Sequence, residues 1–144
     1  MKKNIRVDWE PFYDQDMWQL GHIFEAFYRL GYDVETSIPE FMNSESRVAM
    51  DNWHPRLSNS PSDEVIMLHE RELFKFKKRT KEQYYPENCL RWIGEVYAYL
   101  IYYTSLTSKE IYKELPLSVM LDYYVVGHEM SIERFAERLC TVSD

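Results

Sequence analysis

The stretch RWIGEVYAYLIYYTS, residues 91–105, decides the fold of this chain. It holds four tyrosines, one tryptophan and five aliphatic residues, with one Glu and one Gly among them. Its apolar run is shorter than the roughly 20 residues that a bilayer crossing needs, and Glu95 interrupts the run. Apolar side chains occupy nearly every face at helical spacing, which is typical of a helix buried on most sides. We therefore expect the central core helix of a helical bundle, and neither a membrane span nor an aromatic ligand box.

The limits and the polar face of this helix can also be predicted. Pro86 suits a first helical turn, so we expect the helix to run from Pro86 to about Thr104. Three charged residues at four-residue spacing share one face and are expected to pair as exposed ions: Glu87, Arg91 and Glu95. Gly94 and Ala98 also lie four residues apart, and their small size leaves a shallow patch. We expect the backbone of another helix to approach closely there.

Shorter helices are expected on both sides of this segment. Apolar spacing, caps and stop signals predict helices over 15–30, 61–74, 108–114 and 117–126, and three more that begin at Ser37, Ser44 and Ser131. Alternating apolar residues near the N-terminus leave room for a small β arm within 1–13. The predicted fold is all-α: a compact single-domain bundle of about seven helices, several of them short, around the central aromatic-rich helix.

Length and composition fit one domain of residues 1–144. The alternative is a pair of sub-lobes, 1–74 and 86–144, joined by a polar connector, 75–85. Only 4 glycines are present, which argues against a β-sandwich or barrel. The N-terminus lacks the apolar core of a signal peptide, and we expect two buried free thiols, Cys89 and Cys140, in a reducing cytoplasm. We therefore expect a soluble cytoplasmic protein.

The net charge of −7 does not favour binding to phosphate backbones. The basic segment KFKKRTK, residues 75–81, is the local exception, and its interleaved phenylalanine resembles a small nucleic-acid patch. Because the rest of the chain is acidic, we interpret this segment as a solvated connector. We expect no direct contact with nucleic acid and no membrane partner.

Catalytic and cofactor motifs are missing from the sequence. The four histidines, His22, His54, His69 and His128, do not have the spacing of a zinc site, and no phosphate-binding glycine loop occurs. We expect no metal and no cofactor. Cys89 in a first helical turn could act as a nucleophile, but a core thiol is the preferred interpretation. A small enzyme with a dispersed site remains the alternative, and it would use His22, Glu25, Arg56 or His128.

Partner contacts are predicted from residue types that are frequent in interfaces. The loop NWHPRLSNSPSDE, residues 52–64, contains Trp53, His54 and Arg56. Trp18 and His22 on the first helix complete the candidate partner-binding set. The alternative for the loop is structural, with Trp53 filling the core and Arg56 paired to a nearby acid.

The last third of the chain, residues 92–139, carries a resemblance. A W-I-G-x-x-Y-x-Y helix is followed by an S-K-x-x-Y segment, a tyrosine pair and a histidine, at Trp92, Ile93, Gly94, Tyr97, Tyr99, Ser108, Lys109, Tyr112, Tyr123, Tyr124 and His128. This order resembles small uncharacterised bacterial proteins found in toxin–antitoxin-like gene clusters of gut Firmicutes. The resemblance implies a small partner or antitoxin-like protein, and it implies no catalytic residues.

Taken together, these patterns favour a non-catalytic protein-interaction module. It would be antitoxin-like or inhibitor-like and would act by binding a protein partner, either a toxin or a nucleic-acid-binding protein. The lack of catalytic motifs, the acidic N-terminal half and the surplus of aromatic residues support this hypothesis. The sequence does not predict the oligomeric state.

Overall fold

Eight helices make up the part of the chain that the structure, a computed structural model, describes: residues 13–51, 61–72 and 76–142. In chain order they are α1 (Tyr13–Arg29), α2 (Val34–Met42), α3 (Glu45–Asp51), α5 (Ser62–Glu72), α6 (Cys89–Thr104), α7 (Ser108–Glu114), α8 (Leu117–Gly127) and α9 (Ile132–Val142). Over these residues the chain has no strand, only one isolated β-bridge. The all-α prediction is confirmed. The expected β arm falls mainly on residues 1–12, outside the described residues.

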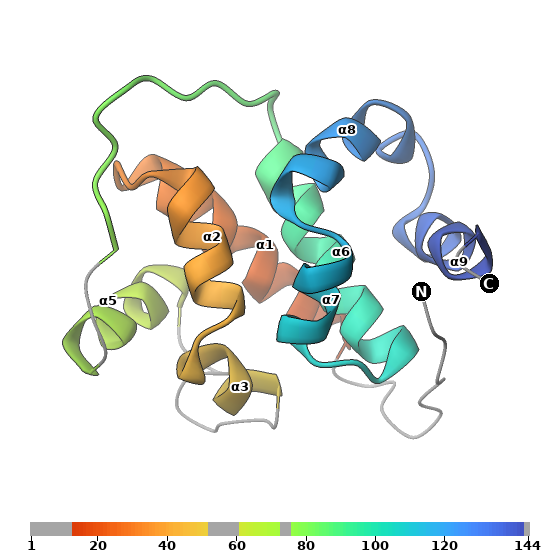
Figure 1. The fold of residues 1–144 in the computed structure, drawn as a ribbon, viewed down its shortest axis with the longest axis horizontal. Coiled ribbons are helices and arrows are strands. Elements are labelled where there is room, and N and C mark those ends of the chain that lie inside the picture. The colour runs from red at the N-terminus through yellow and green to blue at the C-terminus, as the bar shows by residue number, and fades with distance from the viewer. Residues whose placement is uncertain (1–12, 52–60, 73–75, 143–144) are drawn as a thin grey trace.

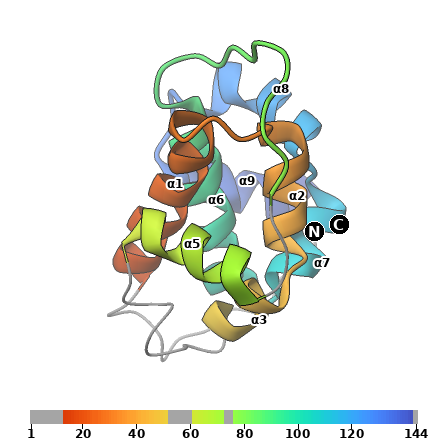
Figure 2. The same cartoon turned by 90° about the vertical axis from the view of Figure 1, so that its left-hand side faces the viewer.

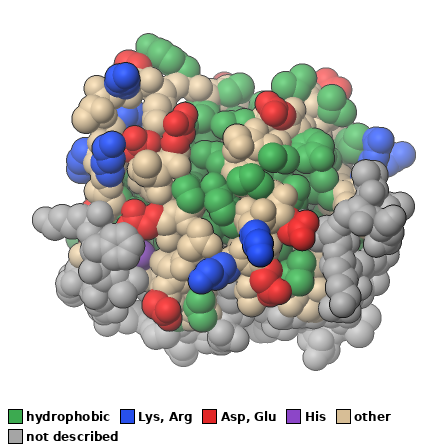
Figure 3. Space-filling model, viewed as in Figure 1, with side chains coloured by type: hydrophobic (Ala, Val, Ile, Leu, Met, Phe, Trp, Pro, Cys, Tyr) green, Lys and Arg blue, Asp and Glu red, His purple; other side chains and the backbone are tan. Residues whose placement is uncertain are grey.

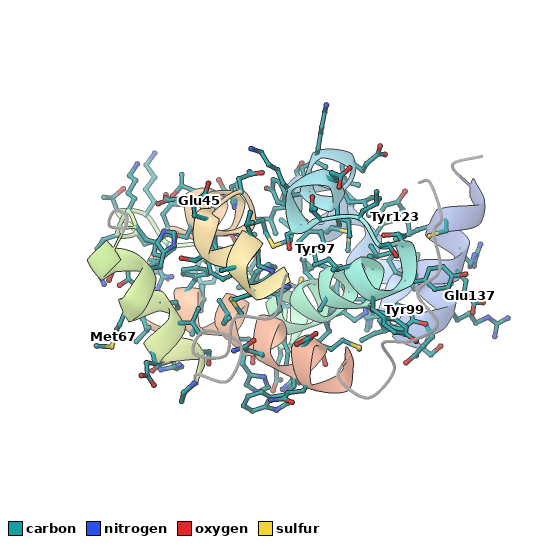
Figure 4. All side chains as sticks on the ribbon, turned by 90° about the horizontal axis from the view of Figure 1, so that it is seen from below. Glu45, Met67, Tyr97, Tyr99, Tyr123 and Glu137 are labelled. Carbon is teal, nitrogen blue, oxygen red and sulfur yellow. The ribbon has the colours of Figure 1, made fainter. Side chains whose placement is uncertain are left out.

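The aromatic helix α6 lies in the middle of the molecule, with the other helices around it (Figures 1 and 2). It packs against α1, α7, α8 and α9. Most of its residues are buried, as the apolar pattern predicts. Tyr97 is fully buried, and Figure 4 shows its ring inside the bundle. The prediction of a central core helix is therefore confirmed.

The polar face of α6 differs from the prediction. Gly94 faces α1 at Gly21, so the expected close approach of a second backbone occurs there. Arg91 and Glu95 do not stand free in solvent, because their side chains are partly buried and their Cγ atoms lie beside Gly21. The expected row of exposed ion pairs is wrong, since α1 covers this face.

The start of α6 is also later than predicted. Pro86 and Glu87 belong to a turn, in which Cys89 N donates to the carbonyl oxygen of Pro86 at 3.0 Å. Asn88 then adopts a left-handed conformation with φ of 67°, which asparagine tolerates better than most residues. The helix begins only at Cys89, so Glu87 is not on the helix.

Two serine caps were expected in the α2–α3 region, and one of them is correct. Ser44 caps α3, because its Oγ accepts from Arg47 N at 3.1 Å. Ser37 caps nothing and is buried inside α2. Asp33 is the cap there, and its Oδ1 accepts from Thr36 N at 3.3 Å. The same Oδ1 accepts from the Gln83 amide at 3.0 Å, so a distant residue helps to hold the cap.

The remaining helices begin and end close to the predicted positions. Thr107 and Glu110 form a capping box at the start of α7. Ser131 Oγ accepts from Arg134 N at 3.1 Å at the start of α9. The helix predicted over 61–74 begins at Ser62.

Buried apolar residues from both predicted sub-lobes belong to one cluster, with members in α1, α2, α3, α5, α6, α7, α8 and α9. Phe27 joins two parts of it, because its ring meets those of Phe41 at 6.0 Å and Phe76 at 4.8 Å. Phe76 precedes α6, so even the segment between the sub-lobes contributes to this core. None of the helices in the described residues combines the length and apolarity that a membrane crossing would require.

Candidate functional site

The loop residues of the predicted site, Trp53, His54 and Arg56, lie outside the described residues. The other two, Trp18 and His22, lie together on the outer face of α1. Their rings stack with centroids 4.1 Å apart, and His22 Nδ1 donates to the carbonyl oxygen of Trp18 at 2.7 Å. Trp18 is 56% exposed, so this pair forms an aromatic platform on the surface.

The described residues of the dispersed enzyme site come from two parts of the chain: His22 and Glu25 lie three residues apart on α1, and His128 follows α8. His22 bonds to the backbone of its own helix. His128, the residue after α8, bonds back to that helix, where its Nδ1 donates to the carbonyl oxygen of Tyr124 at 2.5 Å. Arg56 lies outside the described residues. Within the described ranges, no group of three or more His, Cys, Asp or Glu residues is arranged to hold a metal ion.

The segment 76–88 links α5 to α6 on the surface of the molecule. It overlaps the predicted polar connector 75–85, and from here on we call 76–88 the connector. It arches from α5 across the end of α1 to the start of α6 (Figure 1). Two backbone hydrogen bonds tie it to the turn between α1 and α2: from Asp33 N to Lys77 O at 2.8 Å and from Arg79 N to Gly31 O at 2.9 Å. Gly31 makes this turn possible with φ of 87°. The connector is thus fixed on the body of the protein at its N-terminal end.

Two cations of the basic segment hold the C-terminal end of α1. Arg79 Nη1 donates to the carbonyl oxygens of Tyr28 at 3.1 Å and Tyr32 at 3.2 Å. Lys78 Nζ donates to the carbonyl oxygen of Leu30 at 3.3 Å. Cations are stabilised at this end of a helix by its dipole and by its unpaired carbonyl groups. The interpretation of 75–81 as a merely solvated connector therefore misses the role of these two residues.

A groove lies between the connector and α8. It has a volume of about 460 Å³, and we call it the connector–α8 groove. Its described lining residues are Glu35, Glu82, Gln83, Tyr84, Tyr85, Pro86, Cys89, Leu121, Tyr124 and Val125. Figure 3 shows hydrophobic side chains gathered on this face of the molecule, with acidic side chains at the edge of the gathering.

The α8 wall of the groove is unusually apolar for a surface helix. Apolar residues occupy nearly every side of α8, but only Leu117, Met120 and Gly127 are buried. Val125 is 70% exposed and Val126 is 62% exposed. On the connector side, Tyr84 is 80% exposed. Large exposed apolar groups that gather around one hollow are typical of binding sites.

Two groups inside the groove have pKa values that reflect burial. The Cys89 thiol is almost fully buried, and burial raises its pKa to about 11. It is a core thiol and not an activated nucleophile, as the preferred interpretation expects. Burial, together with the carboxylates of Glu35 and Asp33, raises the pKa of Tyr85 to about 12.

Sequence patterns did not predict one buried polar cluster, which α2, α3 and α5 build together. His69 Nδ1 and Ser46 Oγ share a hydrogen bond at 3.1 Å, and His69 Nε2 lies 3.8 Å from Glu40 Oε1. That distance would suit an ion pair, but burial lowers the pKa of His69 and raises that of Glu40. Both shifts oppose charge on this pair, so burial weakens the ion pair. His69 and Ser46 are buried and Glu40 is partly exposed, and no spacing in the sequence joins these three residues.

Comparison of the chain with family models, with curated proteins and with solved structures finds no match. The resemblance of residues 92–139 to toxin–antitoxin-like proteins therefore stays a prediction. The candidate site rests on the geometry of the connector–α8 groove alone.

Proposed function

We propose that this protein is a non-catalytic protein-interaction module, antitoxin-like or inhibitor-like, that binds a protein partner through the connector–α8 groove and the exposed side of α8. The observation that carries the proposal is the exposure of Val125 and Val126 on a helix that is apolar on nearly every side. Burying such side chains in an interface removes apolar surface from water, which stabilises a complex.

The chemistry of the groove edge favours a basic partner. Glu35 and Glu82 line the groove, and the whole chain carries a net charge of −7. A partner with a basic surface would be attracted to this face and oriented on it. Toxins that act on nucleic acid and other nucleic-acid-binding proteins carry such surfaces, so they are the partner class we propose. The same proposal places the protein in a bacterial cytoplasm, where the thiols of Cys89 and Cys140 stay reduced.

Affinity capture from lysates of the native host, with a matched set of surface variants, tests this function. The bait proteins are the wild type, Val125→Glu, and Met67→Glu as a control. Met67 is 58% exposed on α5 and points away from the body (Figure 4), so the control adds the same charge on another face. Nuclease treatment of the lysate removes proteins that are recovered only through nucleic acid.

The expected result is a protein that the wild type and Met67→Glu recover in equal amounts and that Val125→Glu loses. The loss would follow because a carboxylate placed in the apolar contact would be desolvated without a partner. If all three baits recover the same proteins in the same amounts, the groove is not the binding surface and the proposed function is wrong.

A further inference from the structure

The connector–α8 groove has an anionic lining. Glu35, in the first turn of α2, and Glu82 of the connector line it, and none of the described lining residues is a Lys or an Arg. Arg79 acts electrostatically on Tyr85, but its guanidinium is held by the carbonyl groups of Tyr28 and Tyr32. A hollow lined by two carboxylates between low-dielectric walls concentrates negative potential and attracts a cation.

The walls of the groove are suited to a cation as well. Three tyrosine rings border it: Tyr84, Tyr85 and Tyr124. The faces of aromatic rings attract cations, most often guanidinium groups. The protein already makes such contacts within itself, because the Arg79 guanidinium lies 4.4 Å from the centre of the Tyr28 ring and Lys78 Nζ lies 3.9 Å from that of Tyr32. The connector therefore shows the same chemistry at its fixed end.

One polar atom at the groove has no partner. The hydroxyl oxygen of Tyr85 is buried, and it forms no hydrogen bond within the described part of the chain. That oxygen is shielded from solvent, so the acceptors open to a ligand in the groove are the carboxylates of Glu35 and Glu82, which bind N–H donors. A guanidinium group supplies five N–H donors in a planar fork, whereas a quaternary ammonium supplies none and a lysine supplies a compact, strongly hydrated charge.

We propose that the connector–α8 groove anchors an arginine side chain of the protein partner, with Glu35 and Glu82 as its anionic contacts and the tyrosine rings as its walls. This inference rests on the proposed function, because it names the chemistry by which the partner is recognised. The volume of about 460 Å³ is large enough to admit one long side chain. Leu121 and Val125 offer apolar contacts for the methylene stem of that arginine.

The test is an NMR titration of the full-length protein with N-acetyl-arginine-amide, a blocked arginine. We expect saturable shifts of the Leu121 and Val125 methyl signals, with a dissociation constant in the millimolar range, because one side chain supplies only part of an interface. N-acetyl-citrulline-amide has nearly the same shape without the charge and should cause no saturable shift. Tetramethylammonium, which has no N–H donor, and N-acetyl-lysine-amide should bind more weakly than the blocked arginine.

Charge-neutral variants locate the contact. The double variant Glu35→Gln and Glu82→Gln should weaken binding of the blocked arginine at least several-fold. The matched control, Glu64→Gln and Glu114→Gln, removes two exposed carboxylates from α5 and α7 and should bind as the wild type does. Thermal melts of both variants show whether the fold is kept. Equal weakening in both double variants would mean attraction to net charge alone and would overturn the inference.

Failure of this inference differs from failure of the proposed function. If the blocked arginine causes no saturable shift while Val125→Glu still loses a captured partner, the interaction function stands and the arginine anchor is wrong. If the blocked arginine binds while all baits capture the same proteins, the groove recognises guanidinium groups without serving the proposed partner. Binding of tetramethylammonium as tight as that of blocked arginine would also overturn the anchor, because it would remove the role of N–H donors.

Discussion

Gly94 of α6 lies directly against Gly21 of α1, at the point where the two longest helices cross. A Cβ atom added at Gly94 would come within 2.7 Å of Gly21 Cα and within 2.7 Å of the carbonyl oxygen of Leu20. Both are backbone atoms, so no change of side-chain rotamer can relieve the clash. This contact sets the distance between α1 and α6 and thereby positions the core that both helices share.

We predict that Gly94→Ala destabilises the protein. The overpacked crossing should lower the free energy of unfolding by about 2 kcal/mol, even though alanine is the better helix former by about 1 kcal/mol. Urea denaturation measures the change. The control is Ser118→Ala on the exposed side of α8, which should be neutral or slightly stabilising. A Gly94→Ala protein as stable as the control would show that the helices can separate freely.

Tyr97 supplies a second prediction, on a buried hydrogen bond. Its hydroxyl donates to the carbonyl oxygen of Leu115 at 2.6 Å, and burial raises its pKa. Tyr97→Phe should lower the free energy of unfolding by about 1–2 kcal/mol, because the carbonyl group is left buried without this donor. Tyr84→Phe, at an 80% exposed ring, removes the same atom without such a loss. Chemical denaturation of the pair should separate them, and equal stabilities would contradict the bond's role.

Arg79 should be more important to the fold than its neighbours in the basic segment. Arg79→Met keeps the aliphatic stem but removes the donors to the Tyr28 and Tyr32 carbonyl groups, and it should lower the free energy of unfolding by about 1–2 kcal/mol. Lys81→Met removes an exposed charge of the same sign and should change stability by less than about 0.5 kcal/mol. Similar losses in both variants would instead indicate a general effect of net charge.

The pair of buried His69 and partly exposed Glu40 predicts a pH dependence with two opposing parts. The folded-state pKa of His69 lies below its ordinary 6.5, so its contribution to stability is complete above pH 6.5 and is lost as pH falls toward the folded pKa. The folded-state pKa of Glu40 lies above its ordinary 4.5, so its contribution is complete below pH 4.5 and is lost as pH rises through the folded pKa.

Denaturation curves across this pH range measure both parts. His69→Gln should flatten the loss of stability that begins just below pH 6.5, although the substitution lowers stability at every pH. Glu40→Gln should remove the opposing gain at lower pH and make the loss steeper. Unchanged slopes in both variants would show that other groups carry the acid dependence.

The sequence predicted most helices and the central position of α6 because these depend on local spacing. Apolar residues on nearly every side of residues 92–103 require burial wherever the helix lies, and two small residues predict a close contact without naming its partner. The partner, Gly21, becomes visible only in three dimensions. Its position also explains why Arg91 and Glu95 are partly covered, which charge spacing alone cannot reveal.

Errors at helix ends arose where distant residues decide the local structure. Both Asp33 and Ser37 are suitable caps, and the choice follows from Gln83, whose side chain bonds to Asp33 and to the backbone N–H of Val34. The late start of α6 follows from the left-handed Asn88. The residue pattern within one helix reveals neither the hydrogen bonds of Gln83 nor the conformation of Asn88.

The candidate groove could not be predicted, because its walls come from segments about forty residues apart in the chain. Residues 84–86 and 121–125 meet only after the connector has crossed the end of α1. The apolar pattern of α8 by itself resembles that of a core helix. Of the predicted contact residues, Trp18 and His22 form a pair elsewhere, on α1.

The cap that Arg79 places on α1 has a consequence for recognition. The same connector that closes this helix end continues into Tyr84 and Tyr85, so one wall of the candidate groove is ordered as soon as the protein folds. A partner of the proposed kind would meet a preformed shape and would lose little conformational entropy on docking. Under that proposal, a variant that loosens this helix end would lower both thermal stability and affinity.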